Sequence, residues 1–176
     1  MKAILLSIKP KYVKKILIGE KTIEIRKQKP KCDLPIDVYI YCTKDPTCEL
    51  VNMEHYLFGN PTNALRNGKV VAKFTLNSVE PINIHHYSFY QTYGVESIAD
   101  DNVFYKKSCL ITNQIDDYLC GKQGYAWHID NLKIFDTPKR LTWFRGMKED
   151  VDFVGKPYKK FLTRAPQSYC FIEVEE

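Results

Sequence analysis

Short stretches rich in apolar and β-branched residues recur along the chain, and they predict a sheet-rich fold. In residues 20–27 apolar and polar positions alternate with period two, which is typical of a β-strand. Helical spacing occurs between Pro10, which suits a first helical turn, and Gly19, which suits the position after a helix end. A second helix is expected over 113–119, closed by Gly121. We expect strands at 3–8, 20–27, 36–43, 68–79, 125–135 and 168–174.

Three further segments have no clear period. We expect residues 44–67 to form a loop-rich insertion with a short helix near Cys48–Tyr56, and residues 82–110 to contain short helices. Residues 139–164 are expected to form a basic loop. Because strands outnumber short helices and their order is mixed, the pattern favours an α+β fold, a small barrel decorated with helices. We expect one domain over 1–176, with insertions near 44–67 and 82–122.

The positive charge of the chain is concentrated in two segments. Residues 1–31 contain ten Lys and Arg against two Glu, a charge of +8, whereas the whole chain carries +5. The net charge of residues 32–176 is therefore −3. Residues 139–164 hold eight basic and three acidic residues, a charge of +5. Concentrated positive charge favours a polyanionic partner.

The sequence also lacks the patterns of membrane proteins, exported proteins and zinc sites. No apolar run approaches the ~20 residues of a membrane helix, and the N-terminal apolar stretch is too short for a signal peptide. We therefore expect a cytoplasmic protein with reduced cysteines and no membrane partner. Cys42, Cys48 and His55 have spacings that match no usual zinc site, so we expect no metal and no cofactor.

The alternation in 20–27 predicts two faces for this strand. Lys21, Ile23 and Ile25 should share one face with Lys27, and the isoleucines should enter the core. Thr22, Glu24 and Arg26 should share the other face.

Several motifs stand out: Ser7–Tyr12 with Ile16–Lys27, which contains Gly-Glu-Lys-Thr, then Val38–Thr43, and Gly124–Ile129 with Leu132–Ile134. These motifs resemble ASCH domains, which belong to the PUA-like β-barrel superfamily. The closing Arg164–Cys170 is similar to the tail of small ASCH proteins of phages and prophages. The resemblance implies a PUA-like mixed β-barrel with short helices and a basic cleft beside the first helix that binds RNA or a modified nucleotide. It does not cover 44–67 or 82–122.

Within this resemblance Lys21 becomes a cleft residue that can bind a phosphate or carbonyl oxygen. Glu24 and Arg26 could hold each other, and the Glu24 carboxylate could accept a hydrogen bond from a base edge. The alternatives are a solvated lysine at a strand end and a surface salt bridge worth ~0–1 kcal/mol.

The remaining binding candidates lie elsewhere in the motifs. Tyr41 could stack on a base, and Thr43 could bind phosphate; the alternative for Tyr41 is a barrel-wall aromatic. Gln167 and Ser168 could read polar edges of a nucleotide or merely cap the backbone. Lys9 is the last of the predicted nucleotide-binding residues.

Some relatives of this kind are hydrolases, which remove acetyl groups from acetylated cytidine or cleave RNA. The acetylcytidine hydrolases use a lysine and, three residues later, a threonine nucleophile. Lys21 matches the lysine, but Glu24 stands where the threonine would be. The catalytic candidates are therefore Lys21, Glu24 and His128, whereas Trp127 is expected in the core. Binding is favoured over hydrolysis, and a phage-type protein-interaction module remains a third alternative. The oligomeric state stays open.

Overall fold

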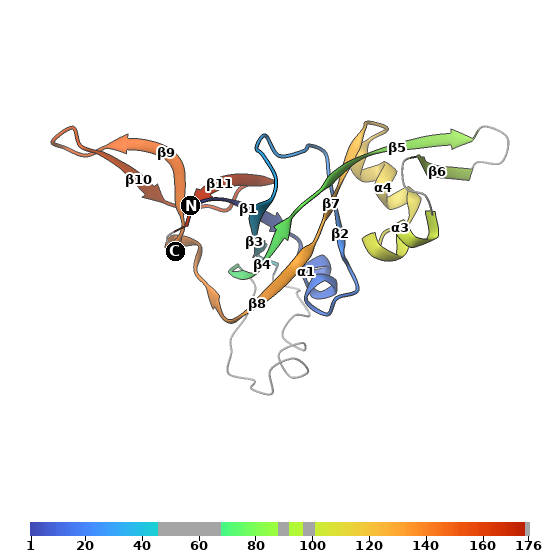
Figure 1. The fold of residues 1–176 in the computed structure, drawn as a ribbon, viewed down its shortest axis with the longest axis horizontal. Helices are drawn as coiled ribbons and strands as arrows, with labels where there is room; N and C mark the ends of the chain where they lie inside the picture. The colour runs from blue at the N-terminus through green and yellow to red at the C-terminus, as the bar shows by residue number, and fades with distance from the viewer. Residues whose placement is uncertain (46–67, 88–91, 97–100, 175–176) are drawn as a thin grey trace. The chain divides into compact units, whose positions relative to one another are not determined.

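A computed structural model describes residues 1–45, 68–87, 92–96 and 101–174 (Figure 1). These residues form two compact units, each assembled from segments that are distant in the sequence. Unit 1 comprises Met1–Leu17, Ile36–Thr75 and Asn131–Glu176, and unit 2 comprises Ile18–Pro35 and Leu76–Asp130. Among the described residues, no helix is long and apolar enough to cross a bilayer. The short helix expected near Cys48–Tyr56 lies outside the described residues.

Unit 1 is built on a mixed seven-stranded sheet in the order β10-β9-β11-β1-β3-β4-β8. Strand β1 lies at its centre, parallel to β3 and antiparallel to β11. The helix α1 (Pro10–Leu17) follows β1 directly, and the 3₁₀ turn Leu141–Trp143 precedes β9. The strands are β1 (Lys2–Ile8), β3 (Ile36–Cys42), β4 (Val70–Leu76), β8 (Asp130–Lys139), β9 (Arg145–Val151), β10 (Pro157–Phe161) and β11 (Tyr169–Glu173).

The core of unit 1 explains why β1 and β3 are so apolar. Both strands are buried along almost their whole length, as expected for strands whose two faces are both covered. Helix α1 buries Val13, Ile16 and Leu17, and the chain leaves it through Gly19, whose φ of +78° is accessible to glycine without strain. The predictions for the first strand, the first helix and its end are confirmed.

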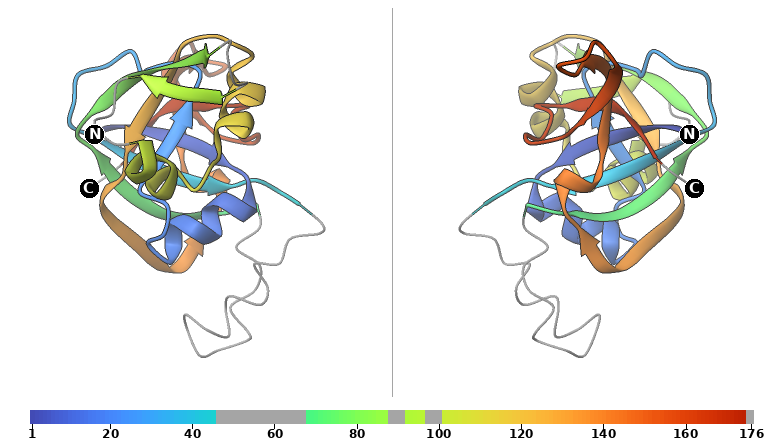
Figure 2. Two further views of the ribbon diagram at one scale, coloured as in Figure 1. Left: turned by 90° about the vertical axis from the view of Figure 1, so that its right-hand side faces the viewer. Right: turned by 90° about the vertical axis from the view of Figure 1, so that its left-hand side faces the viewer.

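Unit 2 is built on an antiparallel sheet in the order β2-β7-β5-β6. Its strands are β2 (Ile23–Arg26), β5 (Val79–Tyr87), β6 (Thr92–Glu96) and β7 (Gly124–His128). Two short helices, α3 (Asp101–Ser108) and α4 (Thr112–Leu119), pack on this sheet (Figure 2). Their core consists of Ile23, Ile25, Ile82, Phe104, Ile115, Leu119 and Ala126. The inward placement of Ile23 and Ile25 is confirmed.

Three predictions from the pattern were wrong in part. Strands β5 and β6 pair as a hairpin, and α3 is the only helix among the described residues of 82–110. Residues 139–164 are not one loop, because β9 and β10 pair as a hairpin. The strand expected over 125–135 is two strands that belong to different sheets, with Asn131 in the left-handed region at φ +48°. Helix α4 is confirmed, and the left-handed residue Cys120 precedes Gly121 at its end.

Candidate functional site

The candidate site in unit 2 is built where the chain enters β2. Thr22 N–H donates to the carbonyl of Lys107 at 2.9 Å, and the Thr22 carbonyl accepts from Ile129 N–H at 2.9 Å. These backbone bonds fix the entry to β2 against the end of α3 and the end of β7. The side chain of Lys21, one residue earlier, is held in the interior and is only 1% exposed.

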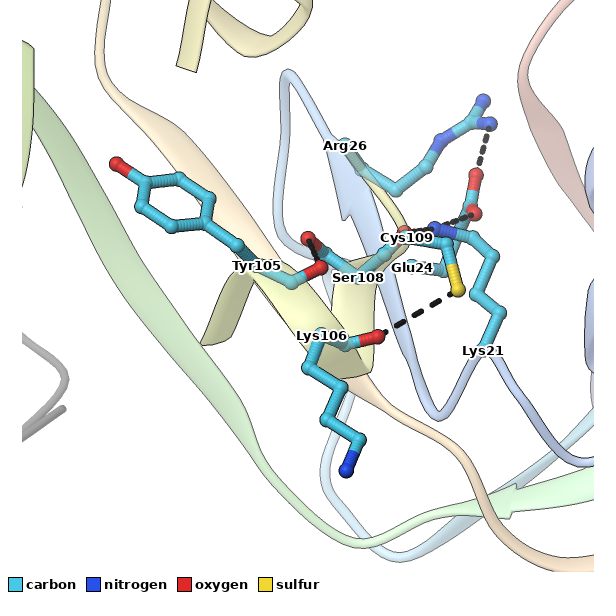
Figure 3. Close-up of polar contacts among 7 residues, drawn as sticks. All are labelled: Lys21, Glu24, Arg26, Tyr105, Lys106, Ser108 and Cys109. Atoms are coloured by element: carbon cyan, nitrogen blue, oxygen red, sulfur yellow. Dashed lines mark hydrogen bonds and ion pairs between the residues drawn. The ribbon is translucent and has the colours of Figure 1, made fainter. Parts of the chain in front are cut away.

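Three charged side chains meet at this point, and we call them the Lys21–Glu24–Arg26 triad (Figure 3). Lys21 Nζ lies 3.3 Å from Glu24 Oε2, and Arg26 Nη1 lies 3.5 Å from Glu24 Oε1. Each oxygen of the Glu24 carboxylate therefore faces a different cation. All three side chains are buried, and together they carry a formal charge of +1.

The C-terminal end of α3 supplies a further partner for Lys21. Lys21 Nζ donates a hydrogen bond of 2.6 Å to the carbonyl of Ser108. The chain then turns through Cys109 at φ +53°, which ends the helix. Carbonyl groups at a helix C-terminus carry partial negative charge, so they attract an ammonium group. Lys21 is thus held by one carboxylate and one helix-end carbonyl.

The geometry excludes the two alternatives considered for these residues. Lys21 is not a solvated lysine, and the Glu24–Arg26 pair is not on the surface. The prediction that Lys21 shares a strand face with Ile23 and Ile25 is wrong. Strand β2 begins only at Ile23, and the Lys21 side chain contacts the Glu24 side chain. That Glu24 and Arg26 hold each other is confirmed.

Tyr118 of α4 belongs to the electrostatic surroundings of the triad. Tyr118 is 38% exposed, and partial burial raises the pKa of its hydroxyl, while the nearby Arg26 charge lowers this pKa and the Glu24 charge raises it. The ammonium of Lys27 lies 5.1 Å from the centroid of the Tyr118 ring, a cation–π contact. An aromatic ring flanked by basic groups therefore lies close to the triad.

His128 and Trp127 lie next to one another on β7 but have different partners. Trp127 is buried, and its indole N–H donates to the Gln28 carbonyl at 3.2 Å, which confirms its expected core position. His128 Nε2 lies 3.3 Å from Glu80 Oε1 on β5. A catalytic role for His128 stays a prediction.

The predicted binding residues of unit 1 lie near the C-terminal end of β1, with one exception. Thr43 N–H donates to the Ile8 carbonyl, and Ser7 N–H donates to the Ser168 carbonyl, both at 2.9 Å. Lys9, Gln167 and Ser168 are exposed, and Thr43 is half-buried.

Tyr41 is the exception. It is 5% exposed within the core of unit 1, where the alternative assignment placed it, and burial raises the pKa of its hydroxyl.

Two partners of the triad were missed by sequence reasoning. Ser108 contributes a backbone carbonyl, which any residue type supplies, so no signal in the sequence could have identified it. Tyr118 lies in the region that the ASCH resemblance did not cover. Within the described residues, no cluster of three or more His, Cys, Asp or Glu could hold a metal ion.

Comparison with known proteins decides the family. A profile of the ASCH domain matches residues 6–138, more than half of the chain, and this range contains the whole triad. The chain belongs to the ASCH domain family. An ASCH domain is a PUA-like domain of RNA-binding type. Membership of this family and the sheet-rich structure with a few short helices confirm the predicted α+β fold class.

Solved ASCH structures resemble the chain at low sequence identity. The ASCH protein from Zymomonas mobilis shares 15% identity at a TM-score of 0.51, covering 97% of this chain and 87% of that chain. A tyrosine-to-phenylalanine mutant of the protein from the same organism shares 18% identity at a TM-score of 0.49, covering 80% and 77%. At such identity the likeness concerns the fold alone. Among curated proteins, none matches the chain.

Proposed function

We propose that this ASCH domain binds single-stranded RNA or a nucleotide, modified nucleotides included, through the Lys21–Glu24–Arg26 triad. The observation that carries the proposal is the burial of three charged side chains with a net charge of +1. Burying charges costs several kcal/mol per ion, and apolar residues of similar size often stabilise a fold as well or better. A function in ligand recognition accounts for keeping charged residues at these positions.

The chemistry of the triad suits a nucleotide. A guanidinium presents a planar set of donors that matches phosphate oxygens, and an ammonium acts as a point charge for the same group. Glu24 orients both cations, so less freedom is lost when an anion binds.

The charge distribution supports the same proposal. The +8 segment 1–31 contains the triad and would attract a polyanion over a longer range than a single contact. Lys9, Thr43, Gln167 and Ser168 of unit 1 stay predicted nucleotide contacts considered by themselves, and the cleft expected beside the first helix also stays a prediction.

We expect Arg26→Gln to weaken RNA binding by about 10- to 150-fold, since a hydrogen bond to a charged group contributes about 1.5–3 kcal/mol. Arg26→Lys keeps the charge without the planar fork and should fall between Arg26→Gln and wild type. The measurement is fluorescence anisotropy with a labelled single-stranded RNA pool and with mononucleotides, on variants whose circular dichroism matches wild type.

Lys133→Gln is the matched control, because it removes one positive charge from an exposed position outside both basic segments. It should weaken binding far less than Arg26→Gln. Equal effects of the two substitutions would remove the special role of the triad. Failure of the wild-type protein to bind any RNA or nucleotide would overturn the proposed function.

The hydrolase alternative is less well supported by this geometry. Lys21 and Glu24 are in contact and are three residues apart, as are the lysine and the threonine nucleophile of the acetylcytidine hydrolases. Both oxygens of Glu24, however, face cations. Such a carboxylate is held in place, which suits positioning better than attack on a substrate. Hydrolysis of acetylated cytidine or RNA therefore stays a prediction of the family resemblance.

A further inference from the structure

The hairpin of β9 and β10 ends in a turn that exposes two apolar side chains. Phe153 is 99% exposed and Val154 is 71% exposed. A phenylalanine buries a large apolar surface when it packs, so complete exposure gives up a favourable contribution to folding. The tip thus has an apolar surface that the fold of unit 1 does not use.

The turn itself is well ordered by hydrogen bonds. Asp152 N–H donates to the Lys156 carbonyl, and Gly155 N–H donates to the Asp152 carbonyl, both at 3.0 Å. The Asp152 carboxylate also accepts from Val154 N–H at 2.9 Å and from Lys156 N–H at 2.8 Å. Gly155 provides the required positive φ of +80°. Phe153 is therefore presented from a fixed turn.

The residue types at the two central positions of this turn are unusual. Gly, Pro, Asn, Asp and Ser dominate turns because they satisfy special dihedral angles or bond the local backbone. Asp152 and Gly155 meet these needs, whereas Phe153 and Val154 do not contribute to them. A departure from local rules that brings no compensating gain to the fold is expected at functional positions.

Behind the tip, the two strands of the hairpin carry both aromatic and basic side chains. Tyr158 is paired in register with Asp150, and Lys160 forms an ion pair with the same Asp150. Arg145 stacks on the Phe161 ring, with its guanidinium carbon 4.8 Å from the ring centroid. The exposed large apolar residues of this region are Trp143, Met147, Val151, Phe153, Val154, Tyr158 and Phe161.

The charge of this region identifies the class of partner. The hairpin Arg145–Phe161 holds five basic and three acidic residues, a charge of +2, and the longer segment 139–164 carries +5, which is complementary to a polyanion. Aromatic side chains among basic ones are the combination that binds single strands, since rings stack on bases while cations contact phosphates. Apolar side chains can also wedge between bases and unstack them.

We propose that the β9–β10 hairpin is a second RNA contact of this protein, with Phe153 at its tip stacking on a base. The inference rests on the proposed function in that the ligand is RNA, but it uses residues of unit 1 that are separate from the triad. Tyr158 contacts an adjoining base, and the exposed Lys148 and Lys156 contact phosphates, whereas Lys159 and Lys160 are held by Glu173 and Asp150.

The test uses the full chain and a fluorescein-labelled, uridine-rich single-stranded RNA in anisotropy titrations. Phe153→Ala should weaken binding by about 5- to 150-fold, the range for removing one aromatic–base stack. Phe153→Trp should bind as wild type, and its added tryptophan emission should be quenched by RNA. Because the side chain is exposed, neither substitution should disturb folding.

Ile111→Ala is the matched control, since Ile111 is an exposed apolar residue, 62% accessible, outside the hairpin. It should leave RNA affinity unchanged. Phe153→Ala binding RNA within about twofold of wild type, while Arg26→Gln binds weakly, would overturn the hairpin inference and leave the proposed function intact. Absence of RNA binding by wild type would overturn both.

Measurements on wild type and Phe153→Ala would also detect two other partners of the hairpin tip, a membrane surface and a second copy of the chain. Vesicles of phosphatidylcholine and phosphatidylserine that bind wild type but not Phe153→Ala, with RNA affinity unchanged, would identify a membrane surface and overturn the inference. Dimers of wild type that Phe153→Ala abolishes in sedimentation, again with RNA affinity unchanged, would do the same in favour of a second copy of the chain.

Discussion

At the scale of single residues, the main feature is a charged network in the interior of unit 2. Lys21 reaches both the Glu24 carboxylate and the Ser108 carbonyl, and Arg26 holds the second Glu24 oxygen. Among the described residues, the Glu24 carboxylate is the anion that both cations face. Glu24 is therefore the residue whose removal should cost the fold most.

We expect Glu24→Gln to lower the free energy of unfolding by about 3–5 kcal/mol, because it leaves two buried cations without their shared anion. Gln has nearly the same size, so the effect reports charge and not packing. Urea denaturation followed by circular dichroism would measure it.

Glu20→Gln makes the same chemical change four residues earlier at an exposed position. It should change stability by less than about 0.5 kcal/mol, as surface substitutions usually do. If Glu24→Gln were equally harmless, the triad would contribute nothing to the interior electrostatics.

At the scale of elements, close packing between α4 and β7 sets the geometry of unit 2. A Cβ atom added at Gly124 would lie 2.6 Å from Leu119 Cδ1 and 3.1 Å from Ile82 Cγ1. Leu119 and Ile82 are themselves buried in the core, so neither can move away freely. The strand can approach the helix only because residue 124 lacks a side chain.

Gly124→Ala should therefore destabilise the protein by about 1–3 kcal/mol through overpacking. Gly146→Ala on β9 is the matched control, because its new Cβ would have an ordinary contact of 3.5 Å with Leu162 Cδ2. Thermal unfolding of both variants would distinguish them, and an equal melting temperature for Gly124→Ala and wild type would contradict the packing argument.

At the scale of the whole molecule, positive charge is concentrated in 1–31 and 139–164, while the chain as a whole carries only +5. Binding of a polyanion should therefore depend on which lysines are removed and not only on how many. That residues 1–176 form one domain stays a prediction, and the described residues divide into two compact units.

We expect the double substitution Lys14→Gln and Lys15→Gln on α1 to reduce the salt dependence of RNA binding. The slope of log K against log salt should fall in magnitude by about 0.7 for each phosphate that the protein no longer neutralises. Lys122→Gln with Lys133→Gln removes two exposed lysines outside both basic segments and should leave the slope unchanged. Equal slopes for the two double variants would show that the local charge has no special role.

The features that depend on local pattern could be predicted from the amino-acid sequence. Apolar spacing placed β1, α1, β3, α4 and β11, and the motif around Lys21 indicated the ASCH family, because these signals lie within a few consecutive residues. Only the tertiary structure decided how Lys21 is used. Its burial depends on the helix-end carbonyl of Ser108, 87 residues away, and a backbone acceptor leaves no trace in the residue type. The β9–β10 hairpin was likewise missed, since its polar, basic strands show no apolar alternation and form by pairing with one another and with β11.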